Sequence, residues 1–190
     1  MAFSYDRFTA APAASANRFV TSTNMLVGSY TVAVNTMPTA GARKVTVTHT
    51  ANTGVDTLGT ITVTGTNLAG GVITDVITPL NGTIATGVKY FNTVTAVTGA
   101  GWVINGGNDT IVVGCDATQA VLDGPGTLHS VIVNTTAAGT VTLADSKGTI
   151  AVLKASIAEG TYYYDIDVNT LTVTQTAASD ITVTRSAAWG

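Results

Sequence analysis

Residues 58–78 read LGTITVTGTNLAGGVITDVIT, and this stretch decides the fold class. Ile61 and Val63 alternate with threonines, which is the two-residue period of a strand with one apolar and one polar face. Residues 66–71 then supply an asparagine and several small residues that let a chain reverse. Over residues 72–77 both faces are partly apolar, because valines and isoleucines alternate. We therefore expect a hairpin whose second strand is covered on each side by another sheet or another subunit.

The alternation continues to the C-terminal end of the chain. Residues 117–126, which follow Asp116, contain Asp123 and a Gly-Pro-Gly run, residues that are typical of a junction between strands or small domains. Six short alternating segments follow: LHSVIVN, TVTLAD, TIAVLKA, YYYDIDV, TLTVTQT and DITVTR. Their regular spacing is typical of an antiparallel β-sandwich or jelly roll. The sequence predicts an all-β chain with an extended N-terminal arm over residues 1–29, a first β domain over 30–116 and a second β-sandwich domain over 117–190.

The predicted arm holds four spaced aromatic residues, Phe3, Tyr5, Phe8 and Phe19, around an Ala/Pro/Ser-rich middle. It shows no sustained period, so it builds no core of its own. It also lacks the basic and apolar regions of a secretory signal. Two interpretations follow: the arm docks on a neighbouring chain through its aromatic side chains, or it packs back on its own sheets. We take the four aromatic residues as candidate interaction residues.

The composition restricts the classes of partner. Charged residues make up only 10% of the chain, against about 25% in typical domains, so threonine, asparagine, serine and glycine fill the polar positions. The chain has few lysines and prolines to protect sheet edges from pairing with other chains, so we expect identical subunits to cover these edges in a homo-oligomer. The net charge of −3 and the absence of a basic cluster larger than Arg43-Lys44 argue against nucleic acid. No apolar run is long enough to span a membrane.

The motifs of catalysis and metal binding are weak. Cys115 is the only cysteine, so it forms neither an intrachain disulfide nor a zinc set, and it fits a small buried side chain better than a reactive thiol. Residues 105–111, NGGNDTI, match one turn of a calcium-binding nonapeptide, but a single copy indicates a hairpin turn. His49 and His129 lie in strand patterns, and Ser130 beside His129 points to the opposite face. The sequence predicts no enzyme, no cofactor and no metal.

Three aromatic residues and two aspartates leave alternatives open. Asp165 and Asp167 are expected to share a strand face with Tyr163, where they form a metal site, a sugar site, an acid/base pair or a plain solvated face. Trp102 lies among glycines and is either an exposed platform for carbohydrate or a core side chain beneath a turn. Trp189 is expected to hold the C-terminal tail. We take Trp102 and Tyr163 as further candidate interaction residues.

Two stretches carry a resemblance to a known class. Residues 124–186, GPGTLHSVIVNTTAAGTVTLADSKGTIAVLKASIAEGTYYYDIDVNTLTVTQTAASDITVTRS, look like a β-sandwich module of tailed-bacteriophage virion proteins. Residues 59–97 are similar in style to hairpin segments in head and tail proteins of the same viruses. The resemblance implies a capsid decoration (cement) protein, a homotrimer on the capsid surface in contact with the major capsid protein. It carries over no catalytic or binding residue.

Two other functions stay open on the residues. The first is a tail, fibre or adhesin domain that recognises surface glycan through Trp102 and the face holding Tyr163, Asp165 and Asp167. The second is a hydrolase that uses the two aspartates. Each differs from the structural interpretation in needing an exposed polar site, so the placement of these side chains discriminates among them.

Overall fold

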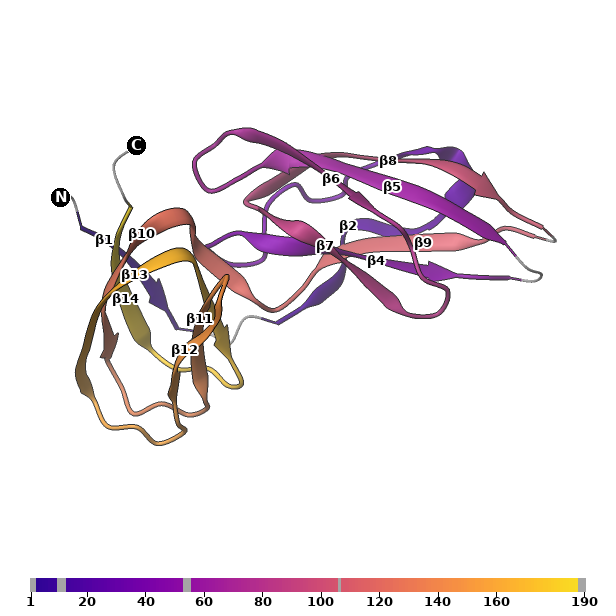
Figure 1. The fold of residues 1–190 in the computed structure, drawn as a ribbon. Helices are drawn as coiled ribbons and strands as arrows, with labels where there is room; N and C mark the ends of the chain where they lie inside the picture. The colour runs from indigo at the N-terminus through magenta and orange to yellow at the C-terminus, as the bar shows by residue number, and fades with distance from the viewer. Residues whose placement is uncertain (1–2, 10–12, 53–55, 106, 188–190) are drawn as a thin grey trace. The chain divides into compact units, whose positions relative to one another are not determined.

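The computed structural model describes residues 3–9, 13–52, 56–105 and 107–187. The fourteen named strands pair antiparallel, and the described residues include one 3-10 helix and no α-helix (Figure 1). The all-β fold class is confirmed. In chain order the elements are β1 (Ser4–Phe8), β2 (Ser15–Asn24), η1 (Met25–Val27), β3 (Ser29–Tyr30), β4 (Arg43–Thr50), β5 (Thr57–Thr66), β6 (Val72–Ile77), β7 (Ile84–Phe91), β8 (Thr93–Val103), β9 (Thr110–Cys115), β10 (Gln119–Val133), β11 (Val141–Asp145), β12 (Gly148–Leu153), β13 (Gly160–Gln175) and β14 (Ile181–Ala187).

These strands form two compact units. The central unit is Ala14–Ala117, and the split unit combines Met1–Ala13 with Thr118–Gly190. The central unit contains two four-stranded sheets, β2-β9-β4-β7 and β3-β8-β5-β6. The split unit contains one six-stranded sheet in the order β1-β14-β10-β13-β11-β12. In the sequence, therefore, the central unit is inserted between the first strand of the split unit and the rest of it.

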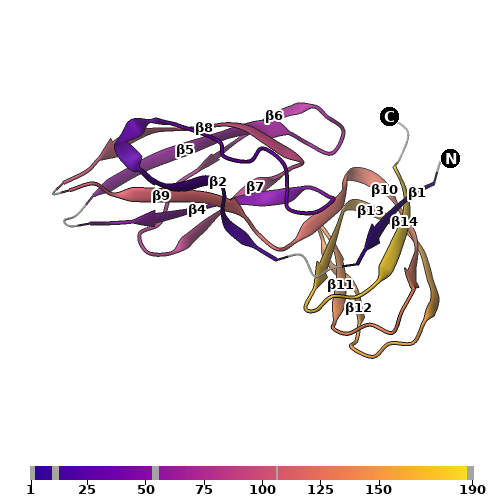
Figure 2. The same cartoon turned by 180° about the vertical axis from the view of Figure 1, so that it is seen from behind.

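The central unit is a sandwich whose core lies between its two sheets. Val47 and Val113 from one sheet and Ile61 and Val97 from the other are all fully buried in a single apolar cluster. Figure 2 shows β2 running beside β9 on one of these sheets. The alternation that predicts a half-polar strand is seen in β5, where the isoleucine and valine face this core and the threonines between them face outward.

The split unit encloses its own core with a single curved sheet (Figure 1). Its two long strands, β10 and β13, pair along most of their length, with shifts of register at three places. One shift lies between Asp123 and Gly126, so the Gly-Pro-Gly run interrupts the ladder of a strand and does not act as a linker. The curvature follows from such bulges, because each one adds local twist and bend to the strand that contains it.

Two of the six segments expected in the C-terminal half are one strand. YYYDIDV and all but the last residue of TLTVTQT lie in β13, because the strand runs unbroken from Gly160 to Gln175 and pairs with β10 on both sides of Asn169. The irregularity that breaks the alternation in β13 is the positive φ of 47° at Asp165. A bulge and a turn look alike in sequence because both interrupt a period of two.

The expectation of an N-terminal arm over residues 1–29 is wrong for the described residues. β1 pairs with β14 in the split unit, and β2 pairs with β9 in the central unit. Phe8 is buried in the core of the split unit and Phe19 in the core of the central unit. The segment packs on its own sheets because each aromatic side chain completes a separate core. The expected boundary at residue 30 accordingly changes, since the first 29 residues are divided between the two units, whereas the boundary expected at residue 117 lies within one residue of the observed division at Thr118.

Candidate functional site

The outer face of the β3-β8-β5-β6 sheet is built without a charged side chain. On the central strand β5, Thr60, Thr62 and Thr64 point outward, because the intervening Ile61 and Val63 fill the core. The cross-strand partners continue this face on both sides. The outward residues are Ser29 on β3, Ala96, Thr98 and Ala100 on β8, Thr60, Thr62 and Thr64 on β5, and Val72, Thr74 and Val76 on β6. We call these ten residues the threonine face.

Two charged side chains lie near the β6 edge of the threonine face, and each one bonds to a backbone group of the neighbouring edge strand. Asp75 of β6 points inward, and its Oδ2 accepts hydrogen bonds from the backbone N–H groups of Val88 and Lys89 at 2.7 and 3.1 Å. The Lys89 Nζ in turn donates to the backbone oxygen of Thr74 at 2.6 Å. These bonds join β6 to β7, which are edge strands of the two opposing sheets. They satisfy backbone groups of both edge strands, and the exposed Lys89 ammonium lies at the β6 edge beside Thr74.

A second candidate is a chain of hydrogen bonds across three strands of the split unit. The Nδ1 of His129 lies 2.9 Å from Oδ1 of Asp165, and its Nε2 lies 3.0 Å from Oγ of Ser186. A carboxylate only accepts, so Nδ1 carries a proton, and in the neutral imidazole Ser186 then donates to Nε2. This is the connectivity of a Ser-His-Asp triad. From the sequence, the serine next to His129 is Ser130, which is expected on the opposite face, and nothing in the sequence places residue 186 beside residue 129.

The burial of these three hydrogen-bonded side chains is the reverse of what nucleophilic catalysis needs. Ser186 is 1% exposed, so a substrate has no route to its Oγ in this structure, whereas the side chain of Asp165 is 69% exposed. In a working triad the serine meets the substrate and the aspartate is shielded. The arrangement instead joins β14, β10 and β13 at the place where the register of β10 and β13 shifts beside His129. We therefore assign it to holding the bulge.

The acidic face of β13 differs from its expected form. The bulge at Asp165 leaves Tyr163, Asp165, Ile166 and Asp167 all exposed, although alternation places Ile166 inward. One carboxylate is used by His129, and Asp167 accepts from Thr127 Oγ1 at 3.2 Å. Among the described residues no group of three or more His, Cys, Asp or Glu side chains is placed to hold a metal ion. The exposed Tyr163 ring beside the two carboxylates is the part of this face that is free to meet a ligand.

A buried histidine and aspartate are hydrogen-bonded in the central unit. His49 Nε2 lies 2.7 Å from Asp109 Oδ2, and both side chains are fully buried. Burial raises the pKa of Asp109, but hydrogen bonds from the backbone of Asn52 and from the His49 ring outweigh it and hold that pKa below its ordinary value. Asp109 belongs to the NGGND motif. Its carboxylate points into the protein, and residue 106 of the motif lies outside the described residues.

Cys115 and Trp102 are core side chains. Burial raises the pKa of the Cys115 thiol despite the nearby positive charge of Arg43, which is the setting of an inert thiol. Trp102 is half-buried and packs against the core of the central unit. A Cβ at Gly99 would overlap the Trp102 ring, so the glycine at this position leaves space for the indole. Trp102 is therefore a weaker glycan platform than Tyr163, and Trp189 lies outside the described residues.

Comparisons were made with protein-family models, curated protein sequences and solved structures. None gives a significant match. The interpretation of this chain therefore depends on its own residues and their geometry. In the part of the chain that the structure describes, no helix has the length and apolar character needed to cross a membrane.

Proposed function

We propose that this chain is a structural protein of a tailed-bacteriophage virion that decorates and stabilises the capsid. It acts at the capsid surface as a homo-oligomer, in the expected form a trimer, in contact with the major capsid protein. Its work is mechanical, so the proposal assigns it no catalytic residue and no cofactor. The observation that supports the proposal is the threonine face, an uncharged sheet surface with outward valines at its β6 edge.

The physical reason is the low cost of covering such a face. Burying a charge costs several kcal/mol unless it is paired, whereas apolar area contributes about 25 cal/mol per Å² when water leaves it. A stable interface takes about 800 Å² and roughly 20–30 residues from each partner, so the ten residues make up only part of one. The threonine face alone is too small for a permanent complex. It suits a protein that contacts several neighbours at once in a symmetric shell.

The experiment uses one edge valine in each unit. Val76 on β6 and Val152 on β12 are both exposed on edge strands, at 59% and 51%. Val76→Lys should reduce self-association and binding to undecorated capsids, because a lysine ammonium loses its water on contact. Val152→Lys is the matched control and should bind as the unmodified chain does. Light scattering gives the mass, and co-sedimentation gives capsid binding. An unmodified chain that is a stable monomer and does not bind undecorated capsids refutes the proposal.

A second candidate is a tail, fibre or adhesin-type module that binds surface glycan, and one observation favours it. Tyr163 is 77% exposed and lies beside the exposed side chains of Asp165 and Asp167, which is the pairing of ring and acceptors that sugars contact. A glycan array tests this function. Binding that is lost in Tyr163→Ala and kept in Tyr5→Ala would favour it, since the two tyrosines are equally exposed.

A further inference from the structure

β1 occupies a site on the edge of β14 that recognises it in several ways. Its five residues pair antiparallel with β14, from Ser4 opposite Arg185 to Phe8 opposite Ile181. Phe8 enters the core of the split unit, and at the other end the Phe3 ring meets the His129 ring edge-on with centroids 4.7 Å apart. Backbone pairing holds the strand, and the two aromatic side chains fix its position along the edge.

Charge complementarity fixes the register. Arg7 donates two hydrogen bonds to Asp180, from Nε at 2.9 Å and from an Nη at 2.7 Å. In the opposite sense, Arg185 Nε donates to Asp6 Oδ2 at 2.8 Å. The site therefore presents one negative and one positive group, and β1 brings the complementary pair in the order Asp-Arg. A shift by one residue sends each side chain of β1 to the other face and breaks both contacts.

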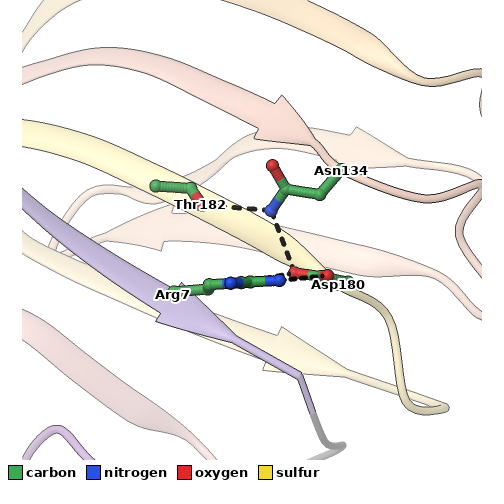
Figure 3. Close-up of polar contacts among 4 residues, drawn as sticks. All are labelled: Arg7, Asn134, Asp180 and Thr182. Carbon is green, nitrogen blue, oxygen red and sulfur yellow. Dashed lines mark hydrogen bonds and ion pairs between the residues drawn. The ribbon is translucent and has the colours of Figure 1, made fainter.

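The negative end of the site is also held from within the split unit. The Asn134 Nδ2 donates to Asp180 Oδ1 at 2.9 Å and to Thr182 Oγ1 at 3.1 Å (Figure 3). The backbone N–H of Asn134 also donates to the carbonyl of Asp180. Figure 3 shows the Arg7 guanidinium reaching Asp180, whose carboxylate is also bonded by Asn134. Because these bonds do not involve β1, the carboxylate is preorganised for an incoming arginine.

We infer that β1 is an exchangeable strand and that the β14 edge is a strand-acceptor site for β1 from a second copy of this chain. The contacts described above for β1 are with Asp180, β14, His129 of β10 and the core of the split unit, and a second copy supplies the identical strand with the identical contacts. Exchange between copies therefore keeps each of these contacts, which is the condition for strand swapping. The inserted central unit makes β1 a separate piece in sequence, since the rest of the split unit begins only at Thr118.

The inference depends on the proposed function in one respect, which is that copies meet at high local concentration. Within one chain, β1 is tethered to the split unit, so its effective concentration at the β14 edge of the same chain is high. An assembly places the β1 of a neighbour at comparable concentration, and exchange then links copies without a new interface. The partner is thus a second copy of this chain, recognised by its Phe3, Asp6, Arg7 and Phe8 side chains.

Reciprocal charge reversal tests this directly. Arg7→Asp places two carboxylates together, and Asp180→Arg places two guanidinium groups together, so each variant opposes its own β1. In an exchanged pair of these two variants both contacts again join opposite charges. Each variant also carries one cysteine, so that a disulfide can report the exchange. Tyr5→Cys is combined with Arg7→Asp, and Thr184→Cys with Asp180→Arg. These two positions are chosen because Tyr5 and Thr184 are directly paired. The purified native proteins are mixed over a range of concentrations, oxidised, and separated without reductant.

The expected result is a covalent heterodimer that increases with concentration. Its yield should be at least about fivefold higher than with Thr182→Cys in place of Thr184→Cys, which puts the thiol opposite position 7 of the incoming strand and out of disulfide range of position 5. One chain carrying Tyr5→Cys and Thr184→Cys should close an internal disulfide and confirm the pairing. Equal yields at the two positions, no heterodimer, or an open internal pair would each overturn the inference. None of these outcomes involves capsids, so the proposed function stands or fails separately.

Discussion

Phe8 and Phe19 lie eleven positions apart, yet the structure places them in different cores, so the same substitution at each should weaken a different unit. Phe-to-Ala changes in cores cost about 3–5 kcal/mol. Phe8 is on a short edge strand, so we expect about 3 kcal/mol for Phe8→Ala in the split unit. Phe19 is fully enclosed, and we expect about 4 kcal/mol for Phe19→Ala in the central unit.

Native-state hydrogen exchange measures each unit by itself. A loss of 3 kcal/mol corresponds to roughly 100-fold faster exchange of the most protected amides. For Phe8→Ala this acceleration should be found in β10 and β13, with β5 and β9 unchanged. For Phe19→Ala the pattern should be reversed. Peptide-level mass spectrometry resolves these strands, and because protection is compared between two units of one molecule, each variant has an internal reference.

Tyr5→Ala is the matched control for Phe8→Ala. Tyr5 lies on the same five-residue strand and is 77% exposed, so its loss should change the free energy of unfolding by less than about 0.5 kcal/mol. If both phenylalanine variants accelerated exchange in the same unit, the division of the N-terminal segment between two cores would be wrong. If Phe8→Ala left β10 and β13 unchanged, β1 would not belong to the split unit.

Three further results are expected. A Cβ at Gly59, where φ is 55°, would overlap the backbone of β8, so Gly59→Ala should destabilise the central unit by more than about 2 kcal/mol in urea unfolding, against about 1 kcal/mol for Gly70→Ala, which has open space. Hydrogen bonds from Arg7 and Asn134 lower the pKa of Asp180 in the folded protein, so this carboxylate binds a proton more readily in the unfolded chain, and the free energy of unfolding falls as the pH drops below about 4. Asp180→Asn should make the stability less dependent on pH, measured as unfolding midpoints from about pH 5 to pH 2. Cys115 should react with a thiol reagent only after unfolding, because it is buried and its pKa is raised; rapid labelling of the native protein would contradict this.

Local features of the fold could be predicted from the sequence. The hairpin of residues 58–78 is present as β5 and β6, and its turn is held by Asn67, whose side-chain oxygen accepts from the backbone N–H groups of Ala69 and Gly71. Alternation also separates the core-facing residues of β5 from the outward threonines. Such features depend on neighbours within a few residues, where period and turn chemistry determine the outcome.

Long-range pairings could not be predicted in the same way. The partner of β1 is β14, far along the chain, and no sequence feature of either strand identifies the other as its partner. The same holds for Ser186, which reaches His129 only because β14 and β10 are neighbours. The threonine face was accessible in part: the sequence shows low charge and outward threonines on one strand, but the sheet order is needed to show that four strands combine into one uncharged surface.

The insertion also links the stabilities of the two units through the chain itself. Within the central unit, Ser15 pairs directly with Cys115, so its two ends lie side by side when it is folded. β1 is then joined to the rest of the split unit by a short tether, and unfolding the central unit lengthens that loop roughly tenfold, which costs about 2 kcal/mol in closure entropy. β1 therefore docks most favourably after the central unit has folded. Until the central unit folds, the β14 edge is open, and the chain's own β1 has its smallest entropic advantage over a β1 strand from another copy. Exchange is therefore most favoured while copies fold close together.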